Sequence, residues 1–277
     1  MQETPADIGP LSFDRPLIMG VVNVTPDSFS DGGDFLNSDA AIRHGLSLVD
    51  DGADILDVGG ESTRPGAQPV SAKQEIARVV PVIMGLAEAG VPISIDSRNA
   101  LVLQAALHAG AAIINDVSAL SHDPASMDVA AAGEGPIILM HASGTPQTMQ
   151  DAPHYDDVVA DVLAYLASRI EACVAAGIAK SRLIVDPGIG FGKTLAHNLS
   201  LLAHLDALHA LGCPILLGAS RKRFIGDVSG AQAPKDRMPG SIAAALAGID
   251  QGVHILRVHD VAQTKQAIDV WQAIVRT

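Results

Sequence analysis

The chain of 277 residues is 48% hydrophobic and 18% charged, which is enough apolar material for one large core. It is acidic, because 31 Asp and Glu residues against 18 Lys and Arg residues give a formal net charge of −13. No long run of Lys and Arg occurs, so the composition argues against a nucleic-acid-binding protein. An anionic ligand would need a local cluster of the few basic residues.

The two cysteines, Cys173 and Cys213, lie in apolar segments, which favours buried thiols in a reducing compartment over a disulfide. The first ten residues, "MQETPADIGP", lack the basic and apolar regions of a secretory signal. No stretch approaches the roughly 18 apolar residues needed to span a membrane. We therefore expect a cytoplasmic protein that makes no membrane contact.

Short apolar runs recur along the chain and alternate with longer segments of helical periodicity. The runs are continuous rather than alternating, which is typical of parallel strands covered on both faces. They predict eight strands, at 17–22, 55–59, 91–96, 112–117, 136–141, 183–188, 214–220 and 254–260.

The segments between these runs predict helices, including 39–51, 72–89, 154–176 and 196–211, and a last helix with Val261, Ile268 and Val275 on one face. Ser71 and Gln74 fit a capping box that opens the second of them. Eight strands alternating with helices favour a (β/α)8 TIM barrel over an open sheet. With no linker or break in composition, we expect a single domain over 1–277, with residues 1–16 as an N-terminal extension.

Each predicted strand ends on polar residues that do not suit a core. In a barrel the carboxyl ends of the strands meet on one face, where active sites are built. Any one of these residues could be a helix cap or a turn residue, but eight groups on one rim favour a functional site. The residues are Asn23, Glu61 to Arg64, Asp96, Asn115, His141, Asp186, Ser220 to Lys222, Arg257 and His259.

These polar ends divide into two chemical groups. Asp96, Asn115 and Asp186 supply hydrogen-bond acceptors and one amide donor, and Lys222 supplies a cation. Such a set suits a flat heterocycle with an amino-pyrimidinone edge, whose N–H groups need acceptors and whose carbonyl needs a donor. A divalent-metal site is the alternative, and two carboxylates alone do not decide between them.

The second group consists of Arg257, His259 and Arg64, which predict an anion pocket with Asn23 nearby as a neutral oxygen ligand. Asp260 is expected to cap the last helix. The stretch "DPGIGFGKT" at 186–194 is glycine-rich but lacks the full phosphate-loop pattern, so its glycines are expected to let the backbone approach a ligand.

Nine motifs, spread over nearly the whole chain, resemble those of the dihydropteroate synthases, a family of pterin-binding barrels. The first two are highly specific. In chain order the motifs are "GVVNVTPDSFSDGG" (20–33), "DVGGESTRPGA" (57–67), "SIDSRNA" (94–100), "IINDVSAL" (113–120), "LMHASGTPQTMQ" (139–150), "YDDV" (155–158), "VDPGIGFGKT" (185–194), "LLGASRKRFIG" (216–226) and "ILRVHDV" (255–261).

The resemblance implies an enzyme that condenses the diphosphate ester of 6-hydroxymethyl-7,8-dihydropterin with p-aminobenzoate. The products would be 7,8-dihydropteroate and pyrophosphate, in folate synthesis. The resemblance also implies Mg²⁺ as the cofactor, with Asn23 at the metal, and a homodimer that pairs through the last helices around 239–275.

The same resemblance implies roles for individual residues. The pterin ring would be held by Asp96, Asn115, Asp186 and Lys222. The diphosphate would be bound by Asn23, Thr63, Arg64, Arg257 and His259, and p-aminobenzoate by Phe29, Thr63, Pro65, Ser220 and Arg223. Asp31, Arg64 and Lys222 are the expected catalytic residues.

The loop "VNVTPDSFSDGG" at 22–33 is predicted to be a mobile lid that closes over the diphosphate and its metal. One hypothesis is that Asp31 faces the positive charge that develops on the pterin methylene as its C–O bond breaks. The alternative is a turn residue before two glycines. The chain departs from the family pattern at Ser97, Ala142 and Arg223, and Arg223 either helps to bind the aminobenzoate carboxylate or faces solvent.

Two other functions remain open from the sequence. A pterin-dependent methyltransferase would use a similar barrel but would not need the diphosphate pocket or the lid loops. A non-catalytic paralogue would bind a pterin or a partner protein without turnover. The intact motifs at 20–33 and 57–67 favour the synthase over both.

Overall fold

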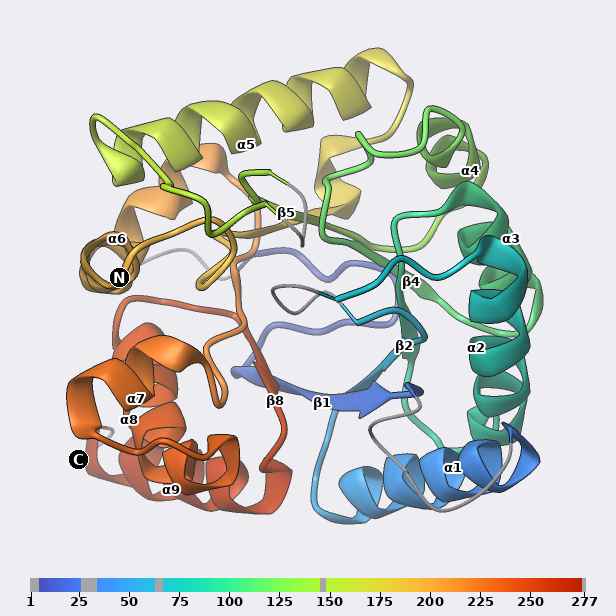
Figure 1. Cartoon of the computed structure of the whole chain (residues 1–277), viewed down its shortest axis with the longest axis horizontal. Coiled ribbons are helices and arrows are strands. Elements are labelled where there is room, and N and C mark those ends of the chain that lie inside the picture. Colours follow the sequence, from blue (N-terminus) through green and yellow to red (C-terminus); the bar gives the residue numbers. More distant parts are fainter. Residues whose placement is uncertain (1–4, 26–33, 63–66, 145–147, 276–277) are drawn as a thin grey trace.

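The computed structural model describes residues 5–25, 34–62, 67–144 and 148–275. Its centre is one sheet of parallel strands in the order β6-β5-β4-β3-β2-β1-β8-β7, with helices around the outside (Figure 1). A parallel bridge between Val185 and Ile215 joins the two ends of this order and closes the barrel. The strands are β1 (Leu17–Asn23), β2 (Ile55–Gly59), β3 (Ile93–Asp96), β4 (Ile113–Asp116), β5 (Ile137–Met140), β6 (Leu183–Asp186), β7 (Leu216–Leu217) and β8 (Ile255–Val258). All eight predicted strands and the (β/α)8 TIM barrel are therefore confirmed.

The helices follow the strands along the chain and cover the outside of the barrel. They are α1 (Asp34–Asp50), α2 (Ala72–Leu86), α3 (Ala100–His108), α4 (Ser126–Ala132), α5 (Val158–Ala175), α6 (Leu195–Ala203), α7 (Arg223–Ser229), α8 (Met238–Asp250) and α9 (Val261–Val275). The predicted capping box is present at α2, where Ser71 and Gln74 exchange hydrogen bonds between side chain and backbone. Across the described ranges, the chain contains no helix of the length and apolarity that crossing a bilayer requires.

The predicted helix at 196–211 is wrong in its second half. The α-helix α6 ends at Ala203, and residues Leu205–Leu211 continue as a 3₁₀ helix. The side chain of Gln251 causes the break, because its oxygen accepts from the Leu205 N–H at 2.8 Å and its amide donates to the Leu202 carbonyl at 2.7 Å. These contacts take over backbone groups that a continuous helix would pair internally.

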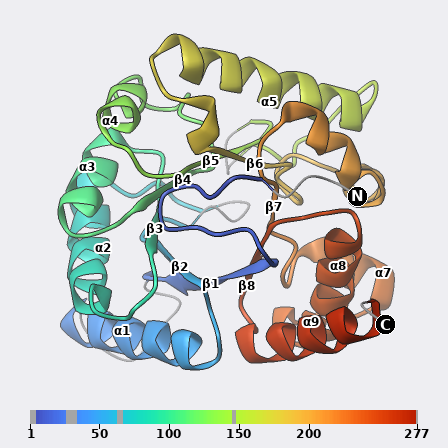
Figure 2. The same ribbon diagram turned by 180° about the vertical axis from the view of Figure 1, so that it is seen from behind.

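The inside of the barrel has an apolar lower layer. Side chains alternate between the two faces of each strand, so one set points outward to the helices and the other fills the interior. Ile8, Leu11 and Phe13 of the N-terminal segment pack together with the interior set. The interior set comprises Leu17, Met19, Ile55, Ile113, Ile138, Ile184, Leu216 and Ile255. Seen from behind, residues before β1 run across this end of the barrel (Figure 2). The first residues of the described chain thus close the barrel at the amino ends of the strands.

The alternation that builds this apolar layer also positions the polar one. A side chain two residues further along a strand again points into the barrel, but it lies one layer nearer the carboxyl ends. Ile55 is followed in this way by Asp57, Ile113 by Asn115, Ile184 by Asp186 and Ile255 by Arg257. The carboxyl half of the barrel interior is therefore lined by charged and amide side chains.

Candidate active site

Charged and amide side chains meet inside the carboxyl half of the barrel, and we call this set the polar layer. It consists of Asp57, Asp96, Asn115, Asp186 and Arg257, with Lys222 from the loop after β7. Arg257 is its centre: Nε donates to Asp57 Oδ2 at 2.6 Å, and Nη2 donates to Asp96 Oδ2 at 2.8 Å. The Asn115 amide donates to both Asp57 oxygens, to Oδ2 at 3.1 Å and to Oδ1 at 3.3 Å. Strands β2, β3, β4 and β8 are thus joined by one hydrogen-bond network.

Burial and neighbouring charges shift the pKa values of Asp96 and Arg257. Burial, helped by the charge of Asp57, raises the pKa of Asp96 to about 7, although Arg257 lowers it. Burial lowers the pKa of Arg257, but Asp57 and Asp96 outweigh burial, so the pKa lies above its ordinary value. Arg257 is therefore a permanent cation, while Asp96 can change its protonation near neutral pH.

Asp186 and Lys222 form the other side of the polar layer. Asp186 Oδ1 accepts from the Gly188 N–H at 2.7 Å, and burial raises the pKa of Asp186 while Lys222 lowers it. The Lys222 ammonium donates to the Ile189 carbonyl and lies 4.2 Å from the centre of the Phe191 ring. Burial lowers the pKa of Lys222 to about 8, and Asp186 opposes this change. The half-buried Lys222 cation is thus close enough to the buried Asp186 carboxylate for each to shift the pKa of the other.

The structure therefore brings Asp96, Asn115, Asp186 and Lys222 into one layer, as the sequence predicted. Sequence reasoning missed Asp57, whose side chain is fully buried. The available signal was a lone carboxylate in the middle of an apolar strand, placed two residues after the interior Ile55.

The residues after β7 and β8 lie at the rim of the barrel. His259 Nδ1 lies 3.0 Å from Ser220 Oγ, and the His259 N–H donates to the same oxygen at 3.2 Å. The Arg257 guanidinium pairs with Asp57 and Asp96 inside the barrel. His259, which the sequence grouped with Arg257 in an anion pocket, lies two residues further along the chain, nearer the rim.

Two further rim residues have well-defined partners. The Asp260 carboxylate pairs with Arg221 at 2.5 Å, and its carbonyl accepts from the Thr264 N–H and hydroxyl. The Arg223 side chain is 87% exposed and lies 3.6 Å from Asp227, one helical turn along α7. In this structure the Arg223 side chain therefore faces solvent.

The loops after β2 and β3 are tied together at their base. Arg98 donates to both oxygens of Glu61, at 3.1 and 3.3 Å, and one of these oxygens also accepts from the Val70 N–H at 3.3 Å. Phe29, Asp31, Thr63, Arg64 and Pro65 lie outside the described residues.

Asn23 ends β1 at the rim and is paired in register with Gly59 of β2. Within the described residues, no group of three or more His, Cys, Asp or Glu side chains could hold a metal ion. Asn23 offers one neutral amide oxygen. Because Mg²⁺ usually takes only one or two protein oxygens beside waters and phosphate, this donor set fits a metal that a bound diphosphate mainly holds.

Comparisons with known proteins of similar sequence and fold place the chain in a family. A family model described as "Pterin binding enzyme" matches residues 19–259. The dihydropteroate synthase of Neisseria meningitidis serogroup B (strain ATCC BAA-335 / MC58) is 49% identical over 269 residues, which cover 95% of this chain and 94% of that protein. The chain belongs to the dihydropteroate synthase family. The family predicted from the sequence motifs is therefore confirmed.

Solved structures agree with this membership. The Xanthomonas albilineans dihydropteroate synthase with 4-aminobenzoic acid has a TM-score of 0.91 and 52% identity, covering 96% of each chain. The same organism's dihydropteroate synthase in complex with 7,8-dihydropteroate has a TM-score of 0.88 and 48% identity, again covering 96% of each chain. The barrel is thus shared with these relatives.

Proposed function

We propose that the chain is a transferase of folate biosynthesis, which condenses 6-hydroxymethyl-7,8-dihydropterin diphosphate with p-aminobenzoate to give 7,8-dihydropteroate and pyrophosphate. The observation that carries this proposal is the polar layer, a buried set of acceptors and cations at the carboxyl ends of the barrel strands. The relatives bound to 4-aminobenzoic acid and to 7,8-dihydropteroate support both halves of the reaction.

In this proposal the polar layer binds the pterin ring. Asp96 and Asp186 accept ring N–H groups, Lys222 donates to the ring carbonyl, and the Asn115 amide can do either. Burial raises the pKa of both carboxyl groups, which reflects the cost of removing them from water. A ring that hydrogen-bonds to them offsets this cost, so the site selects an amino-pyrimidinone edge.

The reaction breaks the bond between the pterin methylene carbon and the diphosphate oxygen, and forms a bond from that carbon to the amine nitrogen of p-aminobenzoate. The diphosphate leaves with the bonding electron pair, and the amine nitrogen loses one proton. Because an aryl amine is already nucleophilic, the protein's main task is to hold the two substrates in line and exclude water. We propose that Asp31 faces the positive charge that develops on the methylene, and that Arg64 and Lys222 are the other catalytic residues.

For the remaining binding roles we keep the predicted sets. The diphosphate is proposed to be bound by Asn23, Thr63, Arg64, Arg257 and His259. For p-aminobenzoate the proposed residues are Phe29, Thr63, Pro65, Ser220 and Arg223. Arg257 is also paired with Asp57 and Asp96 of the polar layer, next to the proposed ring site. Mg²⁺ is proposed to enter with the diphosphate, whose charge it neutralises, with Asn23 as its protein ligand.

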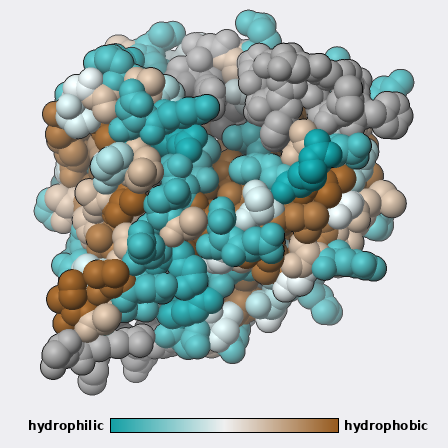
Figure 3. All heavy atoms as spheres, turned by 90° about the horizontal axis from the view of Figure 1, so that it is seen from below, coloured by the Kyte–Doolittle hydropathy of each residue, from teal (hydrophilic) through white to brown (hydrophobic). Residues whose placement is uncertain are grey.

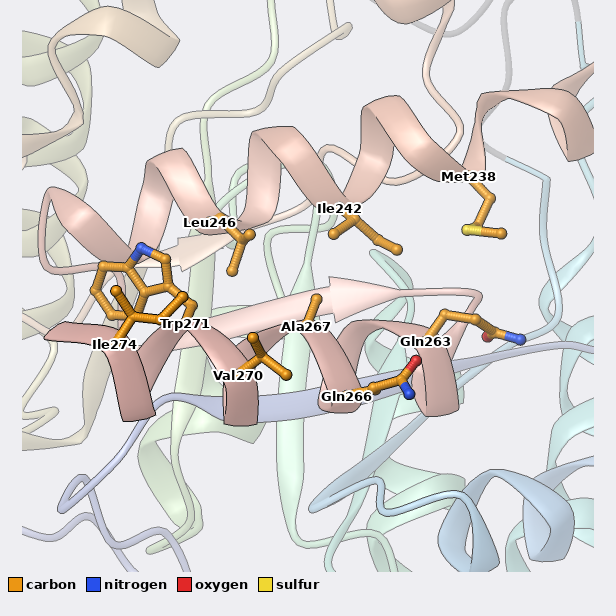
Figure 4. A pocket seen from close by; sticks show the side chains of 9 residues that line it. All are labelled: Met238, Ile242, Leu246, Gln263, Gln266, Ala267, Val270, Trp271 and Ile274. Carbon is orange, nitrogen blue, oxygen red and sulfur yellow. The ribbon is translucent and has the colours of Figure 1, made fainter. Parts of the chain in front are cut away.

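We further propose a homodimer that pairs through α8 and α9. A groove of about 520 Å³ runs between these helices and is lined by Met238, Ile242, Leu246, Gln263, Gln266, Ala267, Val270, Trp271 and Ile274. Figure 4 shows the apolar side chains of the two helices facing one another across it. Val270 and Ile274 are exposed, and patches of hydrophobic residues interrupt the otherwise largely hydrophilic face in Figure 3. A second copy of the chain would cover them.

Sedimentation equilibrium tests the dimer. The 28.5 kDa chain should sediment at twice its mass, and Val270→Asp should return it to the monomer mass. Dilution should also shift the emission of Trp271, the chain's single tryptophan. A wild-type chain that sediments as a monomer at all concentrations would refute this part of the proposal.

The proposed reaction is tested by pyrophosphate release from the dihydropterin diphosphate with magnesium, with and without p-aminobenzoate. We expect dihydropteroate and pyrophosphate together only when both substrates are present. Lys222→Met should lower kcat/KM at least 100-fold, whereas Lys265→Met, at an exposed lysine paired with Asp269, should leave it within twofold. Pterin binding without turnover would indicate the non-catalytic paralogue, and methyl transfer from a methylated pterin would indicate the methyltransferase.

The cytoplasmic, single-domain chain also remains a proposal. Cys173 and Cys213 are both free and buried, which supports a reducing compartment. One sheet holds all eight strands, and Ile8, Leu11 and Phe13 of the N-terminal extension pack against its interior, which supports one folding unit.

A further inference from the structure

Beside the polar layer lies a buried lysine to which the proposed reaction gives no role. The Lys193 side chain is 3% exposed. Its Nζ lies 2.8 Å from His141 Nδ1, 3.0 Å from the Gly188 carbonyl, 3.1 Å from the Phe191 carbonyl and 3.4 Å from the His141 carbonyl. A buried amino group with four such neighbours connects the end of β5 to the loop between β6 and α6.

The carbonyls of this loop are held by side-chain donors one after another. Lys193 holds those of Gly188 and Phe191, Lys222 holds that of Ile189, the Gln150 amide donates to Gly190 at 2.9 Å, and the Tyr155 hydroxyl donates to Gly192 at 2.8 Å. Within residues 188–192, the backbone supplies one hydrogen bond of its own, from the Phe191 N–H to the Gly188 carbonyl. The conformation of this loop therefore depends on its side-chain donors.

The glycines allow the carbonyls to turn toward these donors. Gly188, Gly190 and Gly192 all have positive φ, at 67°, 84° and 63°. A Cβ atom at Gly188 would lie 1.8 Å from the His141 carbonyl oxygen, and one at Gly192 would lie 2.5 Å from that of Ser143. The sequence predicted that the glycines admit a ligand; here they bring the backbone against the loop after β5.

The two Lys193 contacts bracket the part of the loop that touches the polar layer. Between the Gly188 and Phe191 carbonyls lies Ile189, whose carbonyl accepts from Lys222, and the Phe191 ring lies 4.2 Å from the Lys222 ammonium. The Gly188 N–H also fixes the Asp186 carboxylate. The amino group of Lys193 thus holds Gly188, which contacts Asp186, and Phe191, which contacts Lys222.

We propose that Lys193 is a positioning residue for pterin binding: its amino group fixes the loop 188–191, and the loop in turn aims Asp186 and Lys222 at the ring. This inference rests on the proposed function for its substrate. Burial lowers the pKa of Lys193 to about 7, Asp186 raises it, and Lys222 lowers it. The amino group donates to both carbonyls in either protonation state, since a neutral amine keeps two N–H bonds and can accept from His141 Nδ1–H.

Lys193→Met tests the proposal, because methionine has a similar length but no donor. We expect the KM for the dihydropterin diphosphate and the Kd for 6-hydroxymethylpterin to rise at least 10-fold, with the KM for p-aminobenzoate within threefold of wild type. Lys193→Gln, which can still donate to one carbonyl, should give intermediate values and serves as the test if the Met variant does not fold. Lys265→Met is the exposed control.

Chemical rescue separates positioning from stability. In Lys193→Ala, added ethylammonium should occupy the vacated space and raise the pterin affinity of the variant at least fivefold. It should not raise the pterin affinity of Lys193→Met. If the variants only melt at lower temperature and the folded protein keeps wild-type KM and Kd values for the pterin, Lys193 is structural and the proposal is overturned. A wild-type chain without turnover refutes the proposed reaction instead, and pterin binding by the same variants then still decides the role of Lys193.

Discussion

Replacing Asp57 by asparagine tests the electrostatic logic of the polar layer most directly. Asp57 is fully buried, and its carboxylate accepts from Arg257 Nε at 2.6 Å and from Asn115 at 3.1 Å. Asparagine has nearly the same shape but no charge, and its NH₂ group presents a donor where the carboxylate presented an acceptor. Arg257 then keeps only Asp96 as its carboxylate partner.

The magnitude follows from the two contacts. Each is a hydrogen bond to a charged group, worth about 1.5–3 kcal/mol. The amide oxygen of the new asparagine can keep one of the two hydrogen bonds in a weaker form. The other donor then faces the asparagine NH₂ group, which is itself a donor. We therefore expect Asp57→Asn to lower the free energy of unfolding by about 3 kcal/mol, within the range for breaking a buried ion pair. For a chain of this size that corresponds to a fall in Tm of about 6–12 °C.

Urea unfolding followed by circular dichroism measures the change. The matched control is Asp269→Asn, which removes the same charge from an exposed pair with Lys265 and should cost no more than about 0.5 kcal/mol. A second readout is the titration of Asp96 by NMR. Because the charge of Asp57 raises the pKa of Asp96, the substitution should lower that pKa from about 7.

The reasoning is refuted if Asp57→Asn is as stable as the Asp269→Asn control, within about 0.5 kcal/mol. That result would mean that Arg257 does not need Asp57 as a buried counterion. If stability falls but the pKa of Asp96 does not change, Asp57 contributes through packing and not through its charge.

Gly188→Ala should destabilise the fold by more than about 3 kcal/mol in urea, because its Cβ would lie 1.8 Å from the His141 carbonyl oxygen, whereas Gly230→Ala, in open space, should cost only about 1 kcal/mol. Stability should also fall as the pH drops from about 6.5 towards 4. Burial lowers the pKa of His254 to about 4, so the unfolded chain takes up this proton first, and His254 contributes a loss of about 1.4 kcal/mol per pH unit. His254→Asn should flatten this slope; an unchanged slope would contradict the assignment.

The sequence by itself determined the barrel and the convergence of its polar strand ends. Continuous apolar runs and helical periodicity are local properties, and a barrel brings the carboxyl ends of its strands to one face. Asp96, Asn115 and Asp186 could therefore be assigned to one site before any contact was known. The capping box at Ser71 was predictable for the same reason, because it needs only residues three apart.

Only the tertiary structure decided how those side chains pair. Arg257 and Asp57 are 200 residues apart in sequence, so nothing local indicates that the guanidinium turns into the barrel. Gln251, which is 46 and 49 residues from its partners in sequence, ends α6 by supplying hydrogen bonds that the helix would otherwise make itself. In the sequence, Lys193 is only part of a glycine-rich motif; its contacts with His141, Gly188 and Phe191 are known from the structure alone. Hydrogen bonds and burial between distant residues depend on the packed barrel, and local patterns do not encode them.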